Sequence, residues 1–277
     1  MLEINNVSKR FRTLGKPDVV ALDDVSLEVQ TGQVVGLVGE SGSGKSTLLR
    51  IVMRLERADA GKVVQDGASV LTARGADLKA YRRKTQMVFQ NPMGSLSPRL
   101  TVAQIIEEGM RVHGLHPTSS ARRRRVGELL EMVGMNAADA SRYPASFSGG
   151  QRQRIAIARA LSVEPDLLVC DEAVSALDVS VQAQVLNVLK EMHRELGLSI
   201  LFIAHDLAVV RYLCSHVYVM QSGRIVESGP AETIFAAPRH PYTRELLEAV
   251  PIPDPSSDWL TRGNSHTTEG VTSAPQP

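Results

Sequence analysis

The chain of 277 residues contains little cysteine and few aromatic residues. It has two cysteines, Cys170 and Cys214, and neither belongs to a CxxC pair. This scarcity argues against a zinc site, an iron–sulfur cluster and a disulfide framework, and we expect both thiols to be reduced and buried. Aromatic side chains make up 4% of the sequence, which leaves few rings on which single-stranded bases can stack.

An excess of charge of one sign is also missing. Lys and Arg together number 31 and Asp and Glu number 30, so the formal net charge is +1. Without a general positive field the chain is not expected to bind nucleic acid or anionic lipid over its whole surface, and no nucleic-acid partner is predicted. One dense basic run, residues 122–125, is followed by Glu128 and Glu131, which favours a solvated helix face over a binding patch.

Long hydrophobic runs are absent too. The longest apolar run, residues 198–204, is much shorter than the roughly 18 residues that a membrane-spanning helix needs. The N-terminal residues 1–6 lack the basic and apolar regions of a signal peptide. We therefore expect the chain, taken by itself, to be soluble and cytoplasmic.

What the sequence does contain is an alternation of short apolar runs with stretches of helical periodicity. Residues 34–38, 167–170 and 199–204 lack polar alternation, which is typical of parallel strands covered on both faces. After the first run, apolar residues recur at helical spacing, at Leu48, Ile51, Val52 and Leu55. The pattern predicts an α/β fold.

Two antiparallel pieces are expected beside this core. Residues 2–7 and 22–29 predict one antiparallel pair, and residues 217–220 and 224–227 predict a hairpin. Each piece lies at one end of the α/β pattern in the sequence. We therefore expect both to flank the core sheet.

The remaining organisation is one domain over about residues 1–250. Residues 95–148 lack strand signals and have helical patterning, so we interpret them as a helical insertion within that domain. From Pro251 the composition turns to Pro, Ser, Thr and Gly, and we expect disorder from there to residue 277.

A glycine-rich loop follows the first apolar run. Residues 39–47 match the pattern G-x-x-x-x-G-K-[ST], in which glycines let successive backbone N–H groups point inward at a phosphate. The helix that begins near Lys45 adds the positive end of its dipole. Lys45 is expected to bridge the β- and γ-phosphates, and the Ser46 hydroxyl to ligate Mg²⁺. The residues expected to bind a nucleoside triphosphate here are Gly39, Ser41, Gly42, Gly44, Lys45, Ser46 and Thr47.

Three ionisable residues follow the other apolar runs. Asp171 and Glu172 come where one strand ends, and ligands of open α/β sheets bind at the carboxyl ends of strands. Asp171 is suited to hold Mg²⁺ through water, and Glu172 to act as the general base on the attacking water. The alternative is a pair of solvated loop acids. His205 ends the next run, where position alone leaves it open between a γ-phosphate contact and an ordinary surface histidine.

A further amide-rich helix start identifies a family. Residues 147–152 have the sequence Phe-Ser-Gly-Gly-Gln-Arg, and together with the phosphate loop and the acidic pair they resemble the signature sequence of ABC-transporter nucleotide-binding subunits. The resemblance covers about residues 1–250. It implies a P-loop NTPase of ABC type, in which a mixed central sheet carries an antiparallel β subdomain and an inserted α-helical subdomain.

The resemblance also implies roles for single residues. Gln90 is similar to the Q-loop glutamine, which takes part in catalysis and in holding Mg²⁺ together with Ser46 and Asp171. His205 matches the switch histidine, and Phe11 is placed to stack on adenine. The signature and D-loop residues implied to contact the nucleotide are Ser148, Gly149, Gly150, Gln151 and Asp178.

The implied activity is hydrolysis of ATP, with Mg²⁺, coupled to transport. In the family two subunits dock head to tail, so that each ATP lies between one subunit's phosphate loop and the other's signature. The implied partners are a second ABC ATPase subunit, identical or a paralogue, two transmembrane permease subunits and an extracytoplasmic peptide-binding protein. The permeases would contact residues 90–98 and the helical insertion, which places the chain peripherally at the cytoplasmic face of the cell membrane.

Three further stretches resemble one subfamily. Residues 91–99, 177–184 and 240–254 are similar to the oligopeptide/dipeptide importer ATPases, whose C-terminal extension would begin at about residues 230–250 and continue through 251–277. Nickel and glutathione importers share these features and remain alternatives for the cargo. Many relatives carry clustered cysteines in the extension, but no cysteine follows Cys214, so no cluster is expected.

Two other classes of protein compete with the transporter interpretation. A soluble ABC ATPase of DNA repair would insert a long coiled coil before the signature, and one of translation would carry two cassettes; neither feature is present. A degenerate ATP-binding module is disfavoured because the lysine, both acids and the histidine are retained. Two departures from the family pattern, Ala173-Val174 in place of Pro-Thr and Phe147 in place of Leu, put only the rate in question.

Overall fold

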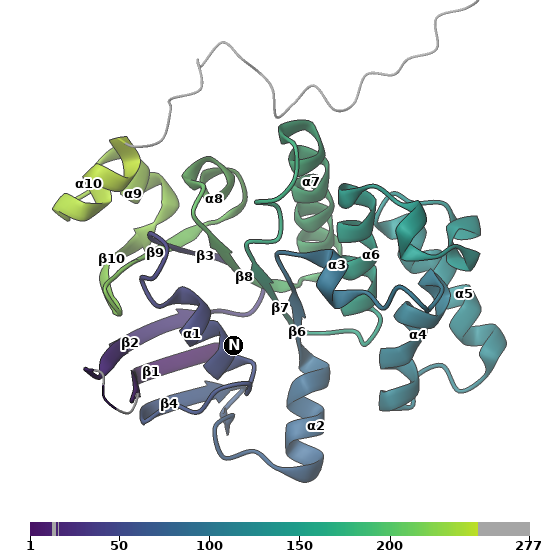
Figure 1. Ribbon diagram of the computed structural model, residues 1–277, viewed down its shortest axis with the longest axis horizontal. Coiled ribbons are helices and arrows are strands. Elements are labelled where there is room, and N and C mark those ends of the chain that lie inside the picture. Colours follow the sequence, from purple (N-terminus) through teal and green to yellow (C-terminus); the bar gives the residue numbers. More distant parts are fainter. Residues whose placement is uncertain (13–14, 16, 249–277) are drawn as a thin grey trace, which may run out of the picture.

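Two sheets organise the fold (Figure 1). The computed structural model describes residues 1–12, 15 and 17–248. The antiparallel sheet has the order β2-β1-β4-β5, with strands β1 Leu2–Phe11, β2 Val19–Val29, β4 Ala60–Gln65 and β5 Ala68–Ser69. The central sheet has the order β10-β9-β3-β8-β7-β6, with strands β3 Val34–Val38, β6 Thr85–Val88, β7 Leu167–Asp171, β8 Ser199–Ala204, β9 His216–Gln221 and β10 Arg224–Pro230.

The middle of the central sheet is parallel and completely covered. Every residue of β3 and β8 is buried, as their uninterrupted apolar sequences predict. The strands are in close register, because Leu37 pairs with Ile203 and Ile203 pairs with Asp171. The chain therefore leaves β3, β7 and β8 at the same edge of the sheet.

Helices cover both faces of the central sheet (Figure 1). The α-helices are α1 Lys45–Val52, α2 Gly75–Lys84, α3 Pro92–Ser95, α4 Val102–His113, α5 Ser119–Met132, α6 Gly149–Leu161, α7 Val179–Leu196, α8 Leu207–Leu213, α9 Ala231–Ala236 and α10 Pro241–Glu248. The described residues also form the 3₁₀-helices η1 Ala137–Ser141 and η2 Pro144–Ser146. Within the described chain, none of these helices is both long and apolar enough to cross a membrane.

Residues 95–148 fold as the helices α4, α5, η1 and η2. Thr101 begins α4 with a capping box, in which its hydroxyl accepts the N–H of Gln104 and the Gln104 side chain accepts the N–H of Thr101. Gly114 ends the same helix in the left-handed conformation that glycine adopts without strain. Helices α4 and α5 pack on α6, so the segment is attached to the central sheet through α6.

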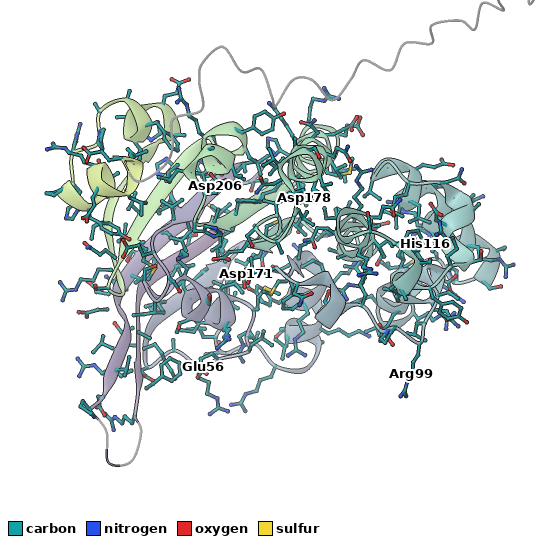
Figure 2. The ribbon with its side chains drawn as sticks, turned by 45° about the horizontal axis from the view of Figure 1, so that its top comes forward. Glu56, Arg99, His116, Asp171, Asp178 and Asp206 are labelled. Carbon is teal, nitrogen blue, oxygen red and sulfur yellow. The ribbon has the colours of Figure 1, made fainter. Side chains whose placement is uncertain are left out.

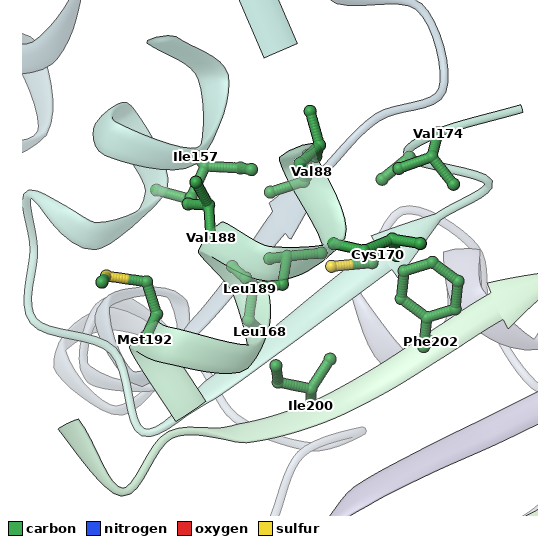
Figure 3. Close-up of a cluster of buried hydrophobic side chains, with 14 of the residues drawn as sticks. Val88, Ile157, Leu168, Cys170, Val174, Val188, Leu189, Met192, Ile200 and Phe202 are labelled. Carbon is green, nitrogen blue, oxygen red and sulfur yellow. The ribbon is translucent and has the colours of Figure 1, made fainter. Parts of the chain in front are cut away.

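The central sheet separates two hydrophobic cores. Along β3, Val34 and Val38 belong to the core beneath α4–α8, while Val35 and Leu37 belong to the core between the central sheet, α1 and the antiparallel sheet. Figure 3 shows part of the first core, where side chains of β7 and β8 meet those of α6 and α7. Cys170 lies in this cluster.

Both cysteines are buried and unpaired, as expected. Cys170 and Cys214 are 0% and 7% exposed. Burial raises the pKa of both thiols. A thiol that stays protonated in an apolar core reacts slowly, so these cysteines act as packing residues.

The structure corrects two details of the sequence interpretation. Helix α1 ends at Val52 and Leu55 is 63% exposed, because Arg54 takes a left-handed φ of 58° that does not continue the helical backbone. The 217–230 hairpin exists, but β9 also pairs in parallel with β3, so the hairpin extends the central sheet instead of flanking it. Strands β4, β5 and β6 were not predicted.

The approach of α6 to α7 gives a prediction on stability. A Cβ atom added at Gly150 would lie 2.0 Å from Cγ1 of Val181. Gly150→Ala is therefore expected to lower the free energy of unfolding by about 1–3 kcal/mol through overpacking, measured by urea denaturation. The double variant Gly150→Ala/Val181→Ala should recover most of that loss. Gly127→Ala in α5 is the control, because its new methyl would meet Ala137 at an ordinary 3.4 Å.

Candidate functional site

The glycine loop is packed tightly between β3 and α1. Gly39 and Gly44 have φ values of 152° and 111°. A Cβ at Gly39 would lie 2.1 Å from the carbonyl oxygen of Met220, and one at Gly44 2.5 Å from that of Ala21. Because both neighbours are backbone atoms of strands β9 and β2, only glycine fits at these two positions. The fold thus fixes the shape of the loop at its beginning and at its end.

The loop presents free backbone donors at the start of α1. Among the described residues, the N–H groups of Lys45, Ser46 and Thr47 have no hydrogen-bond acceptor. No side chain caps this helix, whose N-cap residue is Gly44. Unpaired first-turn amides at the positive end of a helix dipole bind anions such as phosphate. The expected donors for a phosphate group are therefore present.

Lys45 lies inside the loop. Its side chain is buried, and Nζ donates to the carbonyl oxygens of Gly39 and Glu40 at 2.7 Å each and lies 3.3 Å from Oγ of Ser43. Two of the three donors of the ammonium group thus go to carbonyl oxygens at short distance, and the third has only the longer contact with Ser43. Burial lowers the pKa of Lys45, and the nearby charges of Glu172, Asp171 and Glu40 oppose that shift. The ammonium group has neutral partners here, which leaves its charge for an anionic ligand.

Asp171 and Glu172 leave the sheet together at the end of β7. Burial raises the pKa of the Asp171 carboxyl, and the charge of Glu172 raises it further. The charges of Arg50 and Lys45 lower the same pKa. Glu172 has a left-handed φ of 46°, and its N–H donates to the carbonyl oxygen of Ile203 at 2.9 Å. A non-glycine residue held in this conformation points to a functional constraint on the direction of its side chain.

The carboxylate of Glu172 lies at the centre of a polar cluster. Nε2 of Gln90 donates to Oε2 of Glu172 at 2.9 Å, and Nδ1 of His205 lies 3.6 Å from the same oxygen. Nε2 of Gln90 also contacts Oγ of Ser175 at 3.0 Å. The structure therefore brings together three residues that the sequence placed in different motifs. Beside them lies Ser175, the first residue of the segment 175–178 that resembles the D-loop.

This cluster opens into a pocket at the carboxyl edge of the sheet. The pocket has a volume of about 220 Å³ and its lining includes Glu172, Ser175, His205 and Asp206. In Figure 2 the labelled Asp171, Asp178 and Asp206 lie in the central part of the molecule, whereas Arg99 and His116 belong to the helical part.

The predicted signature residues lie elsewhere. Ser148 caps α6: its hydroxyl accepts the N–H of Gln151, and the Gln151 side chain accepts the N–H of Ser148. Helix α6 packs on α4, α5, α7 and β6, whereas α1 packs on β2 and β7. Figure 1 shows α1 and α6 on opposite sides of β6 and β7. The chain does not fold its own signature onto its own phosphate loop.

Two further predicted residues occupy exposed positions. Asp178 is the N-cap residue of α7, is exposed, and makes no side-chain bond to that helix. Phe11 ends β1, is 38% exposed, and has Nζ of Lys9 at 5.2 Å from its ring centroid. Both side chains are thus accessible to a ligand or to another chain.

The fold and the site define a class of protein. A buried parallel strand leads through a glycine loop and its lysine into a helix, and acids stand at the end of a neighbouring strand at the same edge. This combination is that of the P-loop NTPases. The residues that form this combination are those of the glycine-rich pattern, residues 39–47, and of the acidic pair, Asp171 and Glu172.

Comparison with known proteins gives the family. Residues 22–175, more than half of the chain, match the family model ABC transporter, and residues 226–275 match the model Oligopeptide/dipeptide transporter, C-terminal region. The chain is 50% identical over 256 residues to the oligopeptide transport ATP-binding protein OppF of Bacillus subtilis (strain 168), covering 92% of this chain and 84% of that protein. It is 47% identical to OppF of Streptococcus mutans serotype c, with coverages of 92% and 83%. The chain belongs to the ABC transporter family.

Solved structures agree with this assignment. The dimeric structure of a post-hydrolysis state of the ATP-binding cassette MJ0796, bound to ADP and Pi, has a TM-score of 0.75 at 30% identity and covers 83% of this chain and 99% of that one. The structure of cbiO1 from Clostridium perfringens, part of the ABC transporter complex cbiONQ, has a TM-score of 0.75 at 27% identity, with coverages of 85% and 90%. The predicted fold class is confirmed, and ATP hydrolysis is the activity of the family.

Proposed function

We propose that the chain is the ATP-hydrolysing motor subunit of an ABC importer that takes up oligopeptides or dipeptides. The observation that carries this proposal is the cluster of Gln90, Glu172 and His205 at the sheet edge where the buried Lys45 and the free amides of α1 also lie. The cargo is supported by the names of the relatives, which are oligopeptide transport and peptide import proteins, and by the match of residues 226–275 to an oligopeptide/dipeptide transporter region.

Each part of the site has a defined task in hydrolysis. Lys45 and the first-turn amides of α1 bind the terminal phosphates, and Phe11 stacks on the adenine ring. Glu172 polarises the attacking water as general base, with its carboxylate oriented by Gln90. His205, whose Nδ1 faces the same carboxylate, contacts the γ-phosphate.

Magnesium fits the donors present at the site. Mg²⁺ takes oxygen ligands and usually keeps several waters beside one or two protein groups and the phosphates of its nucleotide. The Ser46 hydroxyl, the Gln90 side-chain oxygen and, through water, the Asp171 carboxylate supply such donors. When bound, the ion neutralises phosphate charge. Asp171 ends β7, and its carboxyl lies near enough to Lys45 for the lysine charge to act on its pKa.

The separation of the signature from the phosphate loop supports a head-to-tail dimer. Ser148, Gly149, Gly150, Gln151 and Asp178 would complete the site of a second ABC ATPase subunit, identical or a paralogue. Two transmembrane permease subunits would contact the chain at residues 90–98 and at the helical subdomain, residues 95–148. An extracytoplasmic peptide-binding protein would deliver the cargo, and the chain would sit peripherally at the cytoplasmic face of the cell membrane.

The domain organisation follows the same proposal. Residues 1–250 form the nucleotide-binding domain, and the importer-type C-terminal extension begins at about residues 230–250. The tail at 251–277, for which the sequence predicts disorder, lies outside the described residues.

The nucleotide site is tested by Lys45→Ala. A hydrogen bond between a charged donor and an acceptor contributes about 1.5–3 kcal/mol, so the variant should bind Mg·ATP about 10- to 100-fold more weakly in a titration calorimetry experiment. Lys62→Ala on the exposed part of β4 removes the same charge far from the loop and should leave affinity unchanged. Equal affinity of Lys45→Ala and the wild type would refute the assignment of the loop.

The cargo is tested on the complex purified from membranes. Mass spectrometry should identify permease subunits bound to the chain, and ATP turnover of the reconstituted complex should rise with peptides together with their binding protein. Stimulation by nickel or glutathione but not by peptides would move the assignment to those cargoes. Turnover by a chain that copurifies with no permease would favour a soluble ABC ATPase.

A further inference from the structure

A tyrosine from the C-terminal helix reaches the phosphate loop. Tyr242 lies at the start of α10, is 5% exposed, and accepts the backbone N–H of Glu40 on its hydroxyl oxygen at 2.9 Å. The two residues are 202 positions apart in the sequence. Burial raises the pKa of the Tyr242 phenol, so the hydroxyl stays neutral at physiological pH.

The bonded N–H belongs to the peptide group that also holds Lys45. The peptide between residues 39 and 40 is a rigid plane, whose N–H is that of Glu40 and whose oxygen is that of Gly39. Its oxygen accepts from Nζ of Lys45 at 2.7 Å while its N–H donates to Tyr242. A rotation of this plane away from Tyr242 would therefore also move an acceptor of the lysine ammonium group.

The tyrosine is itself held on the central sheet. Both carboxylate oxygens of Glu227 in β10 accept backbone N–H groups of the segment before α10, from Arg239 at 2.8 Å and from His240 at 3.0 Å. Nδ1 of His240 in turn accepts the N–H of Tyr242 at 3.2 Å. Figure 1 shows α10 beside α9 at the end of the sheet formed by β9 and β10. A continuous chain of hydrogen bonds thus runs from the edge strand to the phosphate loop.

We propose that Tyr242 is a positioning residue of the nucleotide site, through which the C-terminal segment 238–243 holds the 39–40 peptide and prearranges Lys45 for phosphate. The inference rests on the proposed function of the loop in binding ATP. Tyr242 acts on affinity, because it orients the group that receives the phosphates. Among the described residues it makes no hydrogen bond to Glu172 or Gln90, so the chemical step is not expected to depend on it.

The test is the conservative variant Tyr242→Phe, which keeps the ring and removes the hydroxyl. Loss of one hydrogen bond of ordinary strength is expected to weaken Mg·ATP binding about three- to tenfold, and the KM for ATP should rise by the same factor. The kcat at saturating ATP should change less than about twofold. Tyr218→Phe is the matched control, because Tyr218 is also buried and its hydroxyl accepts the N–H of Glu28 at 3.2 Å in β2.

A second variant, at Glu227, tests the same hydrogen bond between Tyr242 and Glu40 by removing the support of the segment before α10. Glu227→Ala releases the segment before α10 and should raise the KM for ATP in the same direction. The double variant Glu227→Ala/Tyr242→Phe should bind Mg·ATP no more weakly than the single variant with the lower affinity, because both substitutions interrupt the same path of hydrogen bonds. Melting temperatures of the free proteins show that each variant is folded under the assay conditions.

Three results would overturn the inference while leaving the ATP site intact. They are an unchanged KM in Tyr242→Phe, an equal rise in Tyr218→Phe, and additive effects in the double variant. A fall in kcat without a change in KM would contradict it as well. Absence of Mg·ATP binding by the wild type, in contrast, would refute the proposed function itself.

Discussion

Replacing Glu172 with glutamine is expected to lower the rate of ATP hydrolysis by a factor of about 10²–10⁴, the usual contribution of a general base. The amide has the same shape as the carboxylate but cannot accept a proton. Its remaining oxygen can still accept from Gln90, whose Nε2 lies 2.9 Å from the Glu172 carboxylate. ATP binding should therefore persist, and the variant should accumulate as a closed, nucleotide-bound dimer.

Two measurements separate this role from a structural one. Single-turnover hydrolysis reports the chemical step, and size-exclusion chromatography with Mg·ATP reports the dimer. Glu164→Gln is the control, because Glu164 is a surface residue whose carboxylate pairs with Arg83. Undiminished turnover of Glu172→Gln would remove Glu172 as the base, and a loss of ATP affinity would show that its charge is needed to form the site.

Placing arginine at Ser148 is expected to abolish hydrolysis at one site of a dimer, namely the site whose phosphate loop belongs to the other subunit. Ser148 caps α6, away from the phosphate loop of its own chain. A large cation at this helix start would block docking against a second nucleotide site. The effect should therefore appear in trans.

Dimers of two differently tagged copies distinguish the two geometries. In the first dimer, one copy carries both Ser148→Arg and Glu172→Gln and the other copy is unchanged. Head-to-tail docking then inactivates both sites, because each site contains one of the two substitutions. In the second dimer, each copy carries one of the two substitutions. Head-to-tail docking then places both substitutions in the same site and leaves the other site active, so turnover should be about half that of the wild type in the absence of cooperativity. If each chain used its own signature, the outcome would be reversed: the first dimer would keep activity and the second would lose it.

The parts of the fold that the sequence predicted are those with local patterns. The phosphate loop and the acidic pair are local patterns in which spacing alone determines what a helix start and a strand end can bind. The buried strands β3, β7 and β8 are equally local, because an uninterrupted apolar run needs cover on both faces. Their positions were predicted directly from the sequence.

The parts that were missed depend on long-range pairing. Strand β4 has exposed residues over its first half, and β6 spans only Thr85–Val88, so neither shows a clear pattern. Leu55 continued the helical spacing of α1, but the left-handed backbone of Arg54 ended the helix first. A positive φ at arginine has no signal in a single sequence, and neither does the parallel partner of a hairpin strand.

The residues of the candidate site also divide into those that a local motif predicts and those that depend on contacts between distant segments. The roles expected of Gln90, Glu172 and His205 came from separate motifs, and the structure places them around one carboxylate. The hydroxyl of Ser175 and that of Tyr242 could not be predicted, because each meets its partner through tertiary packing across many residues.

The capping of ATP by a second polypeptide is tested most directly by crosslinking from the phosphate loop. Ser41 is exposed, whereas Cys170 and Cys214 are buried, so a photoactivatable thiol reagent should label Ser41→Cys and leave the wild type unlabelled. The intact transporter in membranes, carrying Ser41→Cys together with Glu172→Gln, is illuminated with and without Mg·ATP. The account predicts an ATP-dependent covalent dimer, with the label on a Ser-Gly-Gly-Gln type segment of the second ATPase chain. Crosslinks confined to a band of monomer size, with the label on residues 148–151 of the same chain, would contradict it.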